Sequence, residues 1–245
     1  MRSLPSHLEI FHTEDGSPTL VHRRPDGYVE KMHHARGALS ESLYIYQQAL
    51  LKVLECRWPP RILSLGLGLG YNELLSLATL KAQGIQSFKI WSLESEEILR
   101  EEFRGWAMNA MPESELQQIL SQIVGRVSAH AKTTPAALQQ QVRMALETRA
   151  LELRGAFPES LKGIDGCSLV YFDAFSNKMN PELWEEELLV HRLGPHLAKN
   201  CVLATYAATG ALNRALRALG FRLLSKPGFA GKRESTLAVR TDERP

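Results

Sequence analysis

Three glycines at alternate positions, Gly66, Gly68 and Gly70, follow a short apolar run and precede a segment that can form a helix. Glycine adopts a positive φ without strain and lets a backbone approach a ligand closely. Between a buried strand and a helix, such a turn lies at the carboxyl edge of a parallel sheet, where nucleotides bind. The turn also has a plainer interpretation as tight packing of a helix on a strand. Its place before the first helix of an alternating series favours a nucleotide-type cofactor site.

Two carboxylates are expected at the same edge of the sheet. Glu94 ends the second predicted strand, 24 residues after Gly70, where an acid can accept hydrogen bonds from both hydroxyls of a ribose. Asp173 ends the predicted strand 168–172, where it can orient or deprotonate a substrate amine. The alternatives are structural: Glu94 would start a helix and interact with its dipole, and Asp173 would cap a turn or the next helix.

Alternating strands and helices must position these residues. We predict strands at 62–65, 88–93, 123–130, 168–172, 201–205, 221–225 and 235–240, and helices at 39–55, 71–81, 95–123, 135–153, 181–192 and 210–219. This alternation predicts an α/β fold with a mostly parallel sheet and helices on both faces. The closing antiparallel pair is typical of the class I methyltransferase (Rossmann-like) fold, a seven-stranded sheet with a C-terminal antiparallel strand.

The first 57 residues differ in character from the rest. Turn formers at 15–18 and 24–27 separate short extended runs, and residues 20–23 and 28–31 predict a hairpin. We therefore expect residues 1–57 to form an extension of a hairpin and a helix that packs on the core, and residues 58–245 to form the main domain.

Composition excludes several classes of protein. The chain has 245 residues, 44% of them hydrophobic, and no run of about 20 apolar residues that would span a membrane. The N-terminus lacks the apolar core of a signal peptide. Three scattered cysteines in apolar surroundings indicate core thiols in a reducing compartment, so we expect a cytoplasmic protein. Neither a CxxC pair nor an HExxH motif is present, and we expect no metal.

Charge is uneven along the chain although the net charge is only +2. Residues 201–240 contain seven basic residues and one acid, Glu234. Such a region suits a polyanion such as RNA, or else forms a solvated face balanced elsewhere. Within it, Phe229, Lys232 and Arg233 lie in a glycine-rich hairpin that could stack a base and bind phosphate, although such a segment is more often a surface hairpin. The histidine pair that begins at His33 indicates either a proton relay or metal site, or an ordinary loop over the cleft.

Segments 15–20, 33–41, 66–72, 173–184 and 227–234 together resemble the methyltransferase domain of the MnmC-type enzymes, over nearly the whole chain. These enzymes complete 5-methylaminomethyl-2-thiouridine at the wobble position of tRNA. The resemblance implies S-adenosyl-L-methionine as cofactor and methylation of the exocyclic amine of 5-aminomethyl-2-thiouridine. It implies tRNA, through its anticodon region, as partner. Many relatives are fused to a flavin oxidase domain; here we expect a stand-alone methyltransferase, supplied with the aminomethyl substrate by a separate oxidase.

The resemblance also implies roles for individual residues. Asp173 would be catalytic. The cofactor would be held by the glycine turn and two polar residues: Gly66, Gly68, Gly70, Asn72 and Glu94. Substrate or RNA would be bound by His33, Phe175, Tyr206, Phe229, Lys232, Arg233 and Glu234.

The sequence departs from the family pattern at Leu69, Asn177, Met179, Ala207 and Ala208, and no acid follows the third predicted strand at 129–132. Two alternatives therefore stay open. One is a divergent class I methyltransferase that acts on another amine. The other is a non-catalytic module on the same fold that binds RNA or a protein partner.

Overall fold

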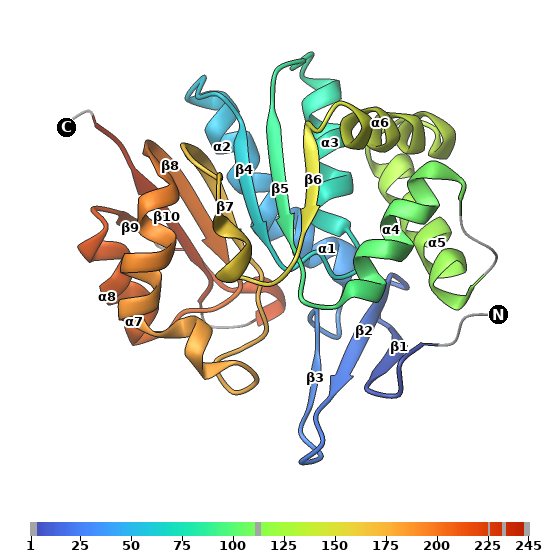
Figure 1. The fold of residues 1–245 in the computed structure, drawn as a ribbon, viewed down its shortest axis with the longest axis horizontal. Helices are drawn as coiled ribbons and strands as arrows, with labels where there is room; N and C mark the ends of the chain where they lie inside the picture. The colour runs from blue at the N-terminus through green and yellow to red at the C-terminus, as the bar shows by residue number, and fades with distance from the viewer. Residues whose placement is uncertain (1–3, 111–113, 225, 232–233, 243–245) are drawn as a thin grey trace.

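A seven-stranded sheet forms the centre of the computed structural model, which describes residues 4–110, 114–224, 226–231 and 234–242 (Figure 1). The strand order is β6-β5-β4-β7-β8-β10-β9. The strands are β4 (Arg61–Leu65), β5 (Lys89–Leu93), β6 (Leu151–Arg154), β7 (Cys167–Phe172), β8 (Leu197–Thr205), β9 (Arg222–Leu224) and β10 (Thr236–Arg240). Only β10 is antiparallel to its neighbours, so the predicted class I methyltransferase fold is confirmed.

The order of the strands reverses between β4 and β7. From β4 the chain builds outward through β5 to β6, whereas β7 returns to the other side of β4 and leads to β8. Such a reversal leaves a crevice at the carboxyl ends of the two strands, and this is where open α/β sheets bind ligands. Gly66 follows β4 and Asp173 follows β7, so the two predicted site segments meet at this point.

Helices cover both faces of the sheet. One face carries α3 (Tyr71–Ala82), α4 (Glu97–Met108), α5 (Glu115–His130) and α6 (Pro135–Glu147); the other carries α7 (Glu186–Leu188) and α8 (Gly210–Ala218) with the short turns η2 (Glu159–Leu161), η3 (Pro181–Trp184), η4 (Leu189–Leu193) and η5 (Gly194–His196). Alternate residues of a strand point to opposite faces. In β7, Leu169 and Tyr171 accordingly enter one core, and Val170 and Phe172 enter the other.

The third strand lies elsewhere than predicted. Residues 123–130 belong to helix α5, and the predicted helix 135–153 ends at Glu147 to leave room for β6. The Ser114 hydroxyl caps α5 by accepting a hydrogen bond from the backbone N–H of Gln117. Its buried face has helical spacing and comprises Leu116, Ile119, Leu120, Ile123, Val124 and Val127. The mostly apolar residues 123–127 are ambiguous by themselves, and the cap at Ser114 favours a helix.

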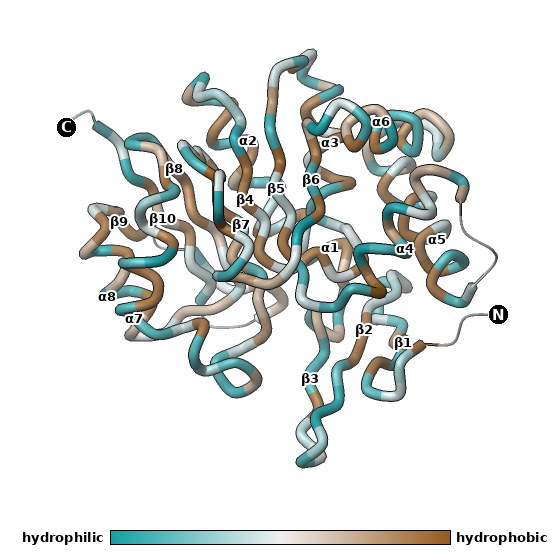
Figure 2. The backbone as a smooth tube through the Cα atoms, in the orientation of Figure 1, coloured by the Kyte–Doolittle hydropathy of each residue, from teal (hydrophilic) through white to brown (hydrophobic). Residues whose placement is uncertain are grey.

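Residues 8–55 form a small antiparallel sheet followed by a helix. The sheet has the order β1-β2-β3, with β1 (Leu8–His12), β2 (Pro18–Arg23) and β3 (Val29–Lys31), and the predicted hairpin corresponds to β2 and β3. The β2–β3 turn projects from the body of the molecule (Figure 1), and its residues are mostly hydrophilic (Figure 2). The helix runs through α1 (Ala38–Ser42), η1 (Leu43–Gln47) and α2 (Gln48–Glu55), and α2 packs against β7 and β8. In the described ranges, no helix is long and apolar enough to cross a membrane.

Candidate functional site

The glycine turn connects β4 to α3 through three residues with positive φ: 102° at Gly66, 51° at Gly68 and 82° at Gly70. A Cβ on Gly66 would lie 2.6 Å from the carbonyl oxygen of Asp173, and one on Gly70 would lie 2.3 Å from the Phe103 ring. These two glycines therefore let β7 and α4 approach the turn. A Cβ on Gly68 would meet only the Met32 sulfur, at 3.4 Å, so this glycine leaves its space to the adjoining cavity.

Gly68→Ala should weaken cofactor binding, at a cost in stability that Gly84→Ala shares because both positions have a positive φ. The added methyl group projects beside Met32 into the cavity, and we expect a loss of affinity of roughly tenfold, equivalent to about 1.4 kcal/mol. Gly84→Ala is the matched control, because Gly84 also has a positive φ (68°) but has open space around its Cβ direction and lies outside the cavity lining. Calorimetric titration with S-adenosyl-L-methionine should separate the two variants; equal affinities would contradict the assignment of Gly68 to the site.

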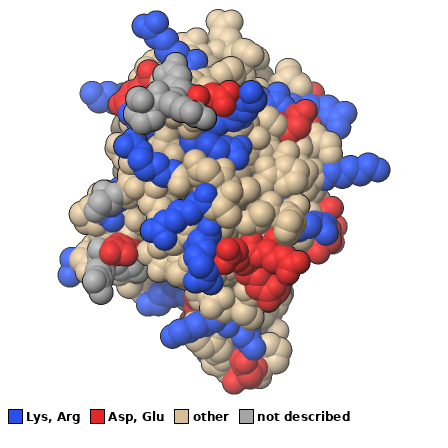
Figure 3. Space-filling view, turned by 90° about the vertical axis from the view of Figure 1, so that its left-hand side faces the viewer, with Lys and Arg blue, Asp and Glu red and all other residues tan. Residues whose placement is uncertain are grey.

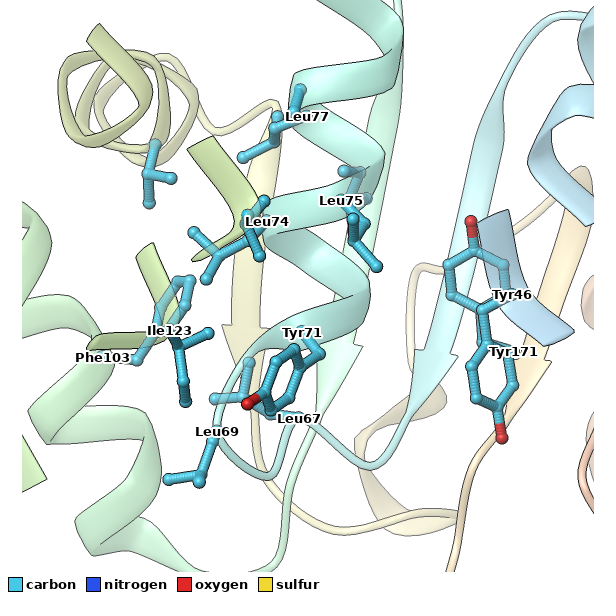
Figure 4. Packing of buried hydrophobic residues seen from close by; sticks show 14 of the residues in the cluster. Tyr46, Leu67, Leu69, Tyr71, Leu74, Leu75, Leu77, Phe103, Ile123 and Tyr171 are labelled. Atoms are coloured by element: carbon cyan, nitrogen blue, oxygen red, sulfur yellow. The ribbon is translucent and has the colours of Figure 1, made fainter. Parts of the chain in front are cut away.

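Leu69 departs from the family pattern, yet its side chain does not line the cavity. It is 2% exposed and packs into the core near Tyr71 (Figure 4). Leu67, on the same turn, does line the cavity. The departure at position 69 therefore changes the core beneath the turn and leaves the wall of the cavity as it is.

Glu94 lies beside the turn, as predicted, and is 7% exposed. Its Oε2 accepts a hydrogen bond from the Gly68 N–H at 2.9 Å, and its Oε1 accepts from the Glu96 N–H at 3.0 Å and from the Ser95 hydroxyl at 3.3 Å. Burial raises the pKa of Glu94, and these hydrogen bonds oppose the rise. A carboxylate offers about four lone-pair positions. Glu94 thus retains capacity to accept a hydrogen bond from a ligand in the cavity.

Asp173 is held by two donors from different parts of the chain. Its Oδ1 accepts from the Tyr46 hydroxyl at 2.6 Å and its Oδ2 from the Asn72 amide at 2.8 Å. Burial raises the pKa of Asp173 well above its usual range; the bonds from Tyr46 and Asn72 lower it, and the nearby charges of Glu41 and Glu73 raise it. The buried Oδ1 of Asn72 has no hydrogen-bond partner. The two hydrogen bonds therefore fix the Asp173 side chain at the end of β7, and its raised pKa makes it a better proton acceptor than an exposed aspartate.

Gly66, Gly68, Asn72, Glu94 and Asp173 line one cavity of about 250 Å³, whereas Gly70, also predicted to hold the cofactor, does not line it. The described residues that line this cavity include four acids, Glu30, Glu94, Asp173 and Glu182, and no Lys or Arg. A second hollow of about 470 Å³ adjoins the first, because both are lined by Glu30, Met32, His33 and Tyr206. The charge of the first cavity favours cationic ligands and disfavours the pyrophosphate of a dinucleotide.

The N-terminal sheet and the loop after β7 form one wall together. Glu30 accepts hydrogen bonds from the backbone N–H and the hydroxyl of Ser176, at 2.8 and 2.5 Å. The Tyr206 hydroxyl donates to the carbonyl of Ala174 at 3.0 Å, and the Trp184 indole N–H donates to the Phe175 carbonyl at 2.7 Å. Phe175 and Tyr206 line the cavity.

The remaining predicted site residues divide into two groups. His33 lines the cavity, with its Nδ1 2.7 Å from the Thr19 hydroxyl, and burial lowers the pKa of His33 to about 4, so the ring is neutral at neutral pH. Phe229, in the turn η6 (Phe229–Gly231), packs against His34 and Tyr44 outside the cavity, and Glu234 is exposed. Lys232 and Arg233 lie outside the described residues.

Sequence reasoning missed several lining residues. Glu30, Asn180, Glu182, Ala156 and Phe157 line the cavity without belonging to a glycine or strand-end pattern. Ala156 and Phe157 follow β6, so the loop after the third strand begins at residue 155 and not at the predicted 129–132. In the correct loop, the positions that line the cavity are again without a carboxylate.

Comparisons with known proteins agree with this geometry. Residues 114–241, about half of the chain, match the model of a family described as S-adenosyl-L-methionine-dependent methyltransferase. The tRNA 5-methylaminomethyl-2-thiouridine biosynthesis bifunctional protein MnmC of Aromatoleum aromaticum is 29% identical over 235 residues, which cover 92% of this chain and 34% of that protein. The protein of the same name from Hahella chejuensis is 30% identical over 123 residues, or 39% of this chain and 20% of the relative.

The chain therefore spans about a third or less of the length of these curated relatives. Among solved structures, MNMC2 from Aquifex aeolicus matches with a TM-score of 0.66 and 24% identity, over 98% of this chain and 72% of that chain. The likeness confirms the fold, and the family match together with the MnmC relatives confirms the predicted resemblance to an MnmC methyltransferase domain.

Proposed function

The chain belongs to the family of S-adenosyl-L-methionine-dependent methyltransferases, and we propose that it methylates the exocyclic amine of 5-aminomethyl-2-thiouridine at the wobble position of tRNA. The observation that carries this proposal is the cavity at the switch point, which has four acids, no Lys or Arg among its described lining residues, and Asp173 at its wall. Both reactants of such a reaction are cations, a sulfonium and an alkylammonium. The names of the MnmC relatives support the tRNA substrate.

The residues present fit the cofactor. The space left by Gly68 and the acceptor capacity of Glu94 suit an adenosine whose ribose hydroxyls donate to the carboxylate. The unpartnered Oδ1 of buried Asn72 can accept a hydrogen bond from a ligand. Ala156 and Phe157 offer an apolar surface for an adenine ring. When bound, S-adenosyl-L-methionine supplies an activated methyl group.

Asp173 would prepare the amine. An alkylamine is mostly protonated at neutral pH and has no free lone pair in that form. Because burial raises the pKa of Asp173, its carboxylate is a better proton acceptor than an exposed aspartate. Tyr46 and Asn72 fix both carboxylate oxygens, and fixed orientation of reacting groups can supply up to about 7–11 kcal/mol of the barrier. Asp173 would hold the ammonium, accept its proton and direct the lone pair into the cavity.

The nucleoside would enter through the second hollow, past His33 and Tyr206. The body of the tRNA would lie against a basic face. The end of the molecule that carries α8 and β9 displays many Lys and Arg side chains beside a group of acids (Figure 3). Exposed members on these elements are Arg214, Arg217 and Arg222. Phosphate contacts of this kind would make binding salt-dependent.

Nucleoside mass spectrometry of tRNA tests the proposal. A strain that lacks the gene should accumulate 5-aminomethyl-2-thiouridine and lose its methylated form, and the purified protein with S-adenosyl-L-methionine should restore it in vitro. Unmodified tRNA from the same strain is the control substrate. Transfer of methyl groups to another amine, with no change in the wobble nucleoside in vivo or in vitro, would instead identify a divergent methyltransferase. No binding of S-adenosyl-L-methionine at all would identify a non-catalytic module.

A further inference from the structure

Three potential metal ligands lie together beside the loop 94–96, which follows β5, and outside the cavity. His7 directly precedes β1, His22 lies in β2, and Glu96 is the N-cap residue of α4. One side-chain donor atom of each lies within 4.8 Å of the others, and this is the one group of three such residues found in the described part of the chain. No local sequence motif indicates this cluster, because its three residues come from three segments that the fold brings together.

The distances suit a tetrahedral ion. With zinc–ligand bonds of about 2.0–2.1 Å, neighbouring ligand atoms of a tetrahedron lie roughly 3.3 Å apart. The Glu96 Oε1 lies 3.2 Å from the His7 Nε2 and 4.0 Å from the His22 Nε2. The two imidazole rings are 5.1 Å apart between centroids and tilted by 58°, so they converge without stacking. Two histidines, one carboxylate and a water form a well-attested zinc ligand set.

The protein groups alone leave this cluster unsatisfied. The His7 Nε2 is a buried atom without a hydrogen bond, although the Glu96 Oε1 lies 3.2 Å away, and the His22 Nδ1, on the other side of the ring from the Nε2 that lies 4.0 Å from Glu96, is also without one. Buried polar atoms are nearly always paired, so each exception calls for an explanation. An ion pair between a protonated His7 and Glu96 is one explanation, and it leaves the second ring without a role. A cation bound between both rings and the carboxylate gives all three residues a role.

We propose that His7, His22 and Glu96 bind a divalent transition-metal ion of the zinc type, with water as a further ligand. The ion would link the N-terminal sheet to the loop 94–96. Its effect would reach the cofactor site by two short routes, because the Glu96 N–H donates to the Glu94 carboxylate and the His22 ring lies edge-on to Phe175, 5.2 Å between centroids. The site is structural and does not depend on which amine the enzyme methylates.

Zinc binding by the untagged, full-length protein tests this. After incubation with zinc chloride and gel filtration, the protein should retain one zinc per chain, measured by elemental mass spectrometry. Competition with a chromogenic chelator should then show that His7→Ala, His22→Ala and Glu96→Gln each lower zinc affinity at least about 100-fold, the upper end of what loss of an outer-shell partner costs. Cobalt chloride should give the visible absorption of tetrahedral cobalt in the wild type and lose it in His22→Ala.

Controls distinguish this site from other zinc ligands. His12→Ala removes an exposed histidine of β1, and Cys56→Ser removes a partly exposed thiol; both should retain zinc. Circular dichroism shows that each variant is folded, and Glu96→Gln preserves shape if an alanine variant is not. No zinc retained by the wild type, or equal affinity in the wild type and the folded ligand variants, overturns the proposal. Neither outcome of the zinc measurement decides which amine the protein methylates.

Discussion

Asp173→Asn should lower the rate of methyl transfer by roughly 10²–10⁴-fold, the usual worth of a positioned proton acceptor, and leave the affinity for S-adenosyl-L-methionine unchanged. The reason is that an amide has the shape of the carboxylate but cannot accept the proton of the amine. The measurement is single-turnover transfer to tRNA with 5-aminomethyl-2-thiouridine, beside calorimetric titration of the cofactor.

The substitution should not disturb the site. The oxygen of Asn at position 173 can still accept from the Asn72 amide, and its NH2 group can donate to the Tyr46 hydroxyl, which can accept as well as donate, so Asn72 keeps its orientation. Asp165→Asn is the control, because Asp165 is exposed and precedes β7 at the opposite end of the strand. Full activity of Asp173→Asn would remove Asp173 from the mechanism.

Tyr46→Phe gives the same assignment a pH signature. Burial raises the pKa of Asp173, and the hydrogen bond from Tyr46 opposes that rise. Loss of the hydroxyl should therefore raise the pKa of Asp173 further and shift the acidic limb of the rate profile to higher pH. An unshifted limb would show that a different group titrates in that range.

Glu73→Gln should stabilise the protein by roughly 3 kcal/mol at pH 8 and by little at pH 4.5, since one pKa unit is worth about 1.4 kcal/mol. Glu73 lies in α3 beneath the glycine turn and is 1% exposed. Burial raises its pKa from 4.5 to about 7, although the Ser92 hydroxyl donates to its Oε1 at 2.6 Å. Its Oε2 and the nearby Ser64 hydroxyl are buried and do not form a hydrogen bond of good geometry, and a glutamine amide can donate to that hydroxyl.

The direction in which stability changes with pH follows from the number of protons that Glu73 binds in the folded and unfolded states. Between pH 4.5 and about 7 the folded state holds the Glu73 proton and the unfolded chain has lost it, so the free energy of unfolding falls as pH rises through this window. In Glu73→Gln this contribution is absent. Urea unfolding at pH 4.5, 6 and 8 measures it, with Glu147→Gln, an exposed residue of α6, as control. A difference that is the same at every pH would contradict the assigned protonation.

Much of the fold followed from local patterns in the sequence. The glycine turn, the apolar strands and the closing antiparallel pair were sufficient to predict the class I methyltransferase fold, with its mostly parallel sheet, that the structure confirms. The third strand was missed because β6 has only four residues, alternates apolar and charged side chains, and directly follows a helix. Its prediction needed the tertiary pairing with β5, which no short window contains.

The site was predictable only where a residue ends a strand. Gly68, Glu94 and Asp173 follow strands at the carboxyl edge, and topology alone brings them to one cavity. The helical spacing predicted Tyr46 only as a core position of a helix, and nothing in the local sequence indicates that its hydroxyl reaches Asp173, 127 residues later. Glu30 was missed for the same reason, because its partner Ser176 is 146 residues away.

These long separations also determine when the cavity can exist during synthesis. The chain emerges from its N-terminus, so the glycine turn and Glu94 are available well before β7, which must pair with β4 to bring Asp173 beside them. Contacts between such distant segments form late in folding. A ligand that needs both halves can bind only the completed sheet and stabilises that state alone. A cofactor that needs both halves of this cavity can therefore bind only to the completed fold, and incomplete chains cannot bind it.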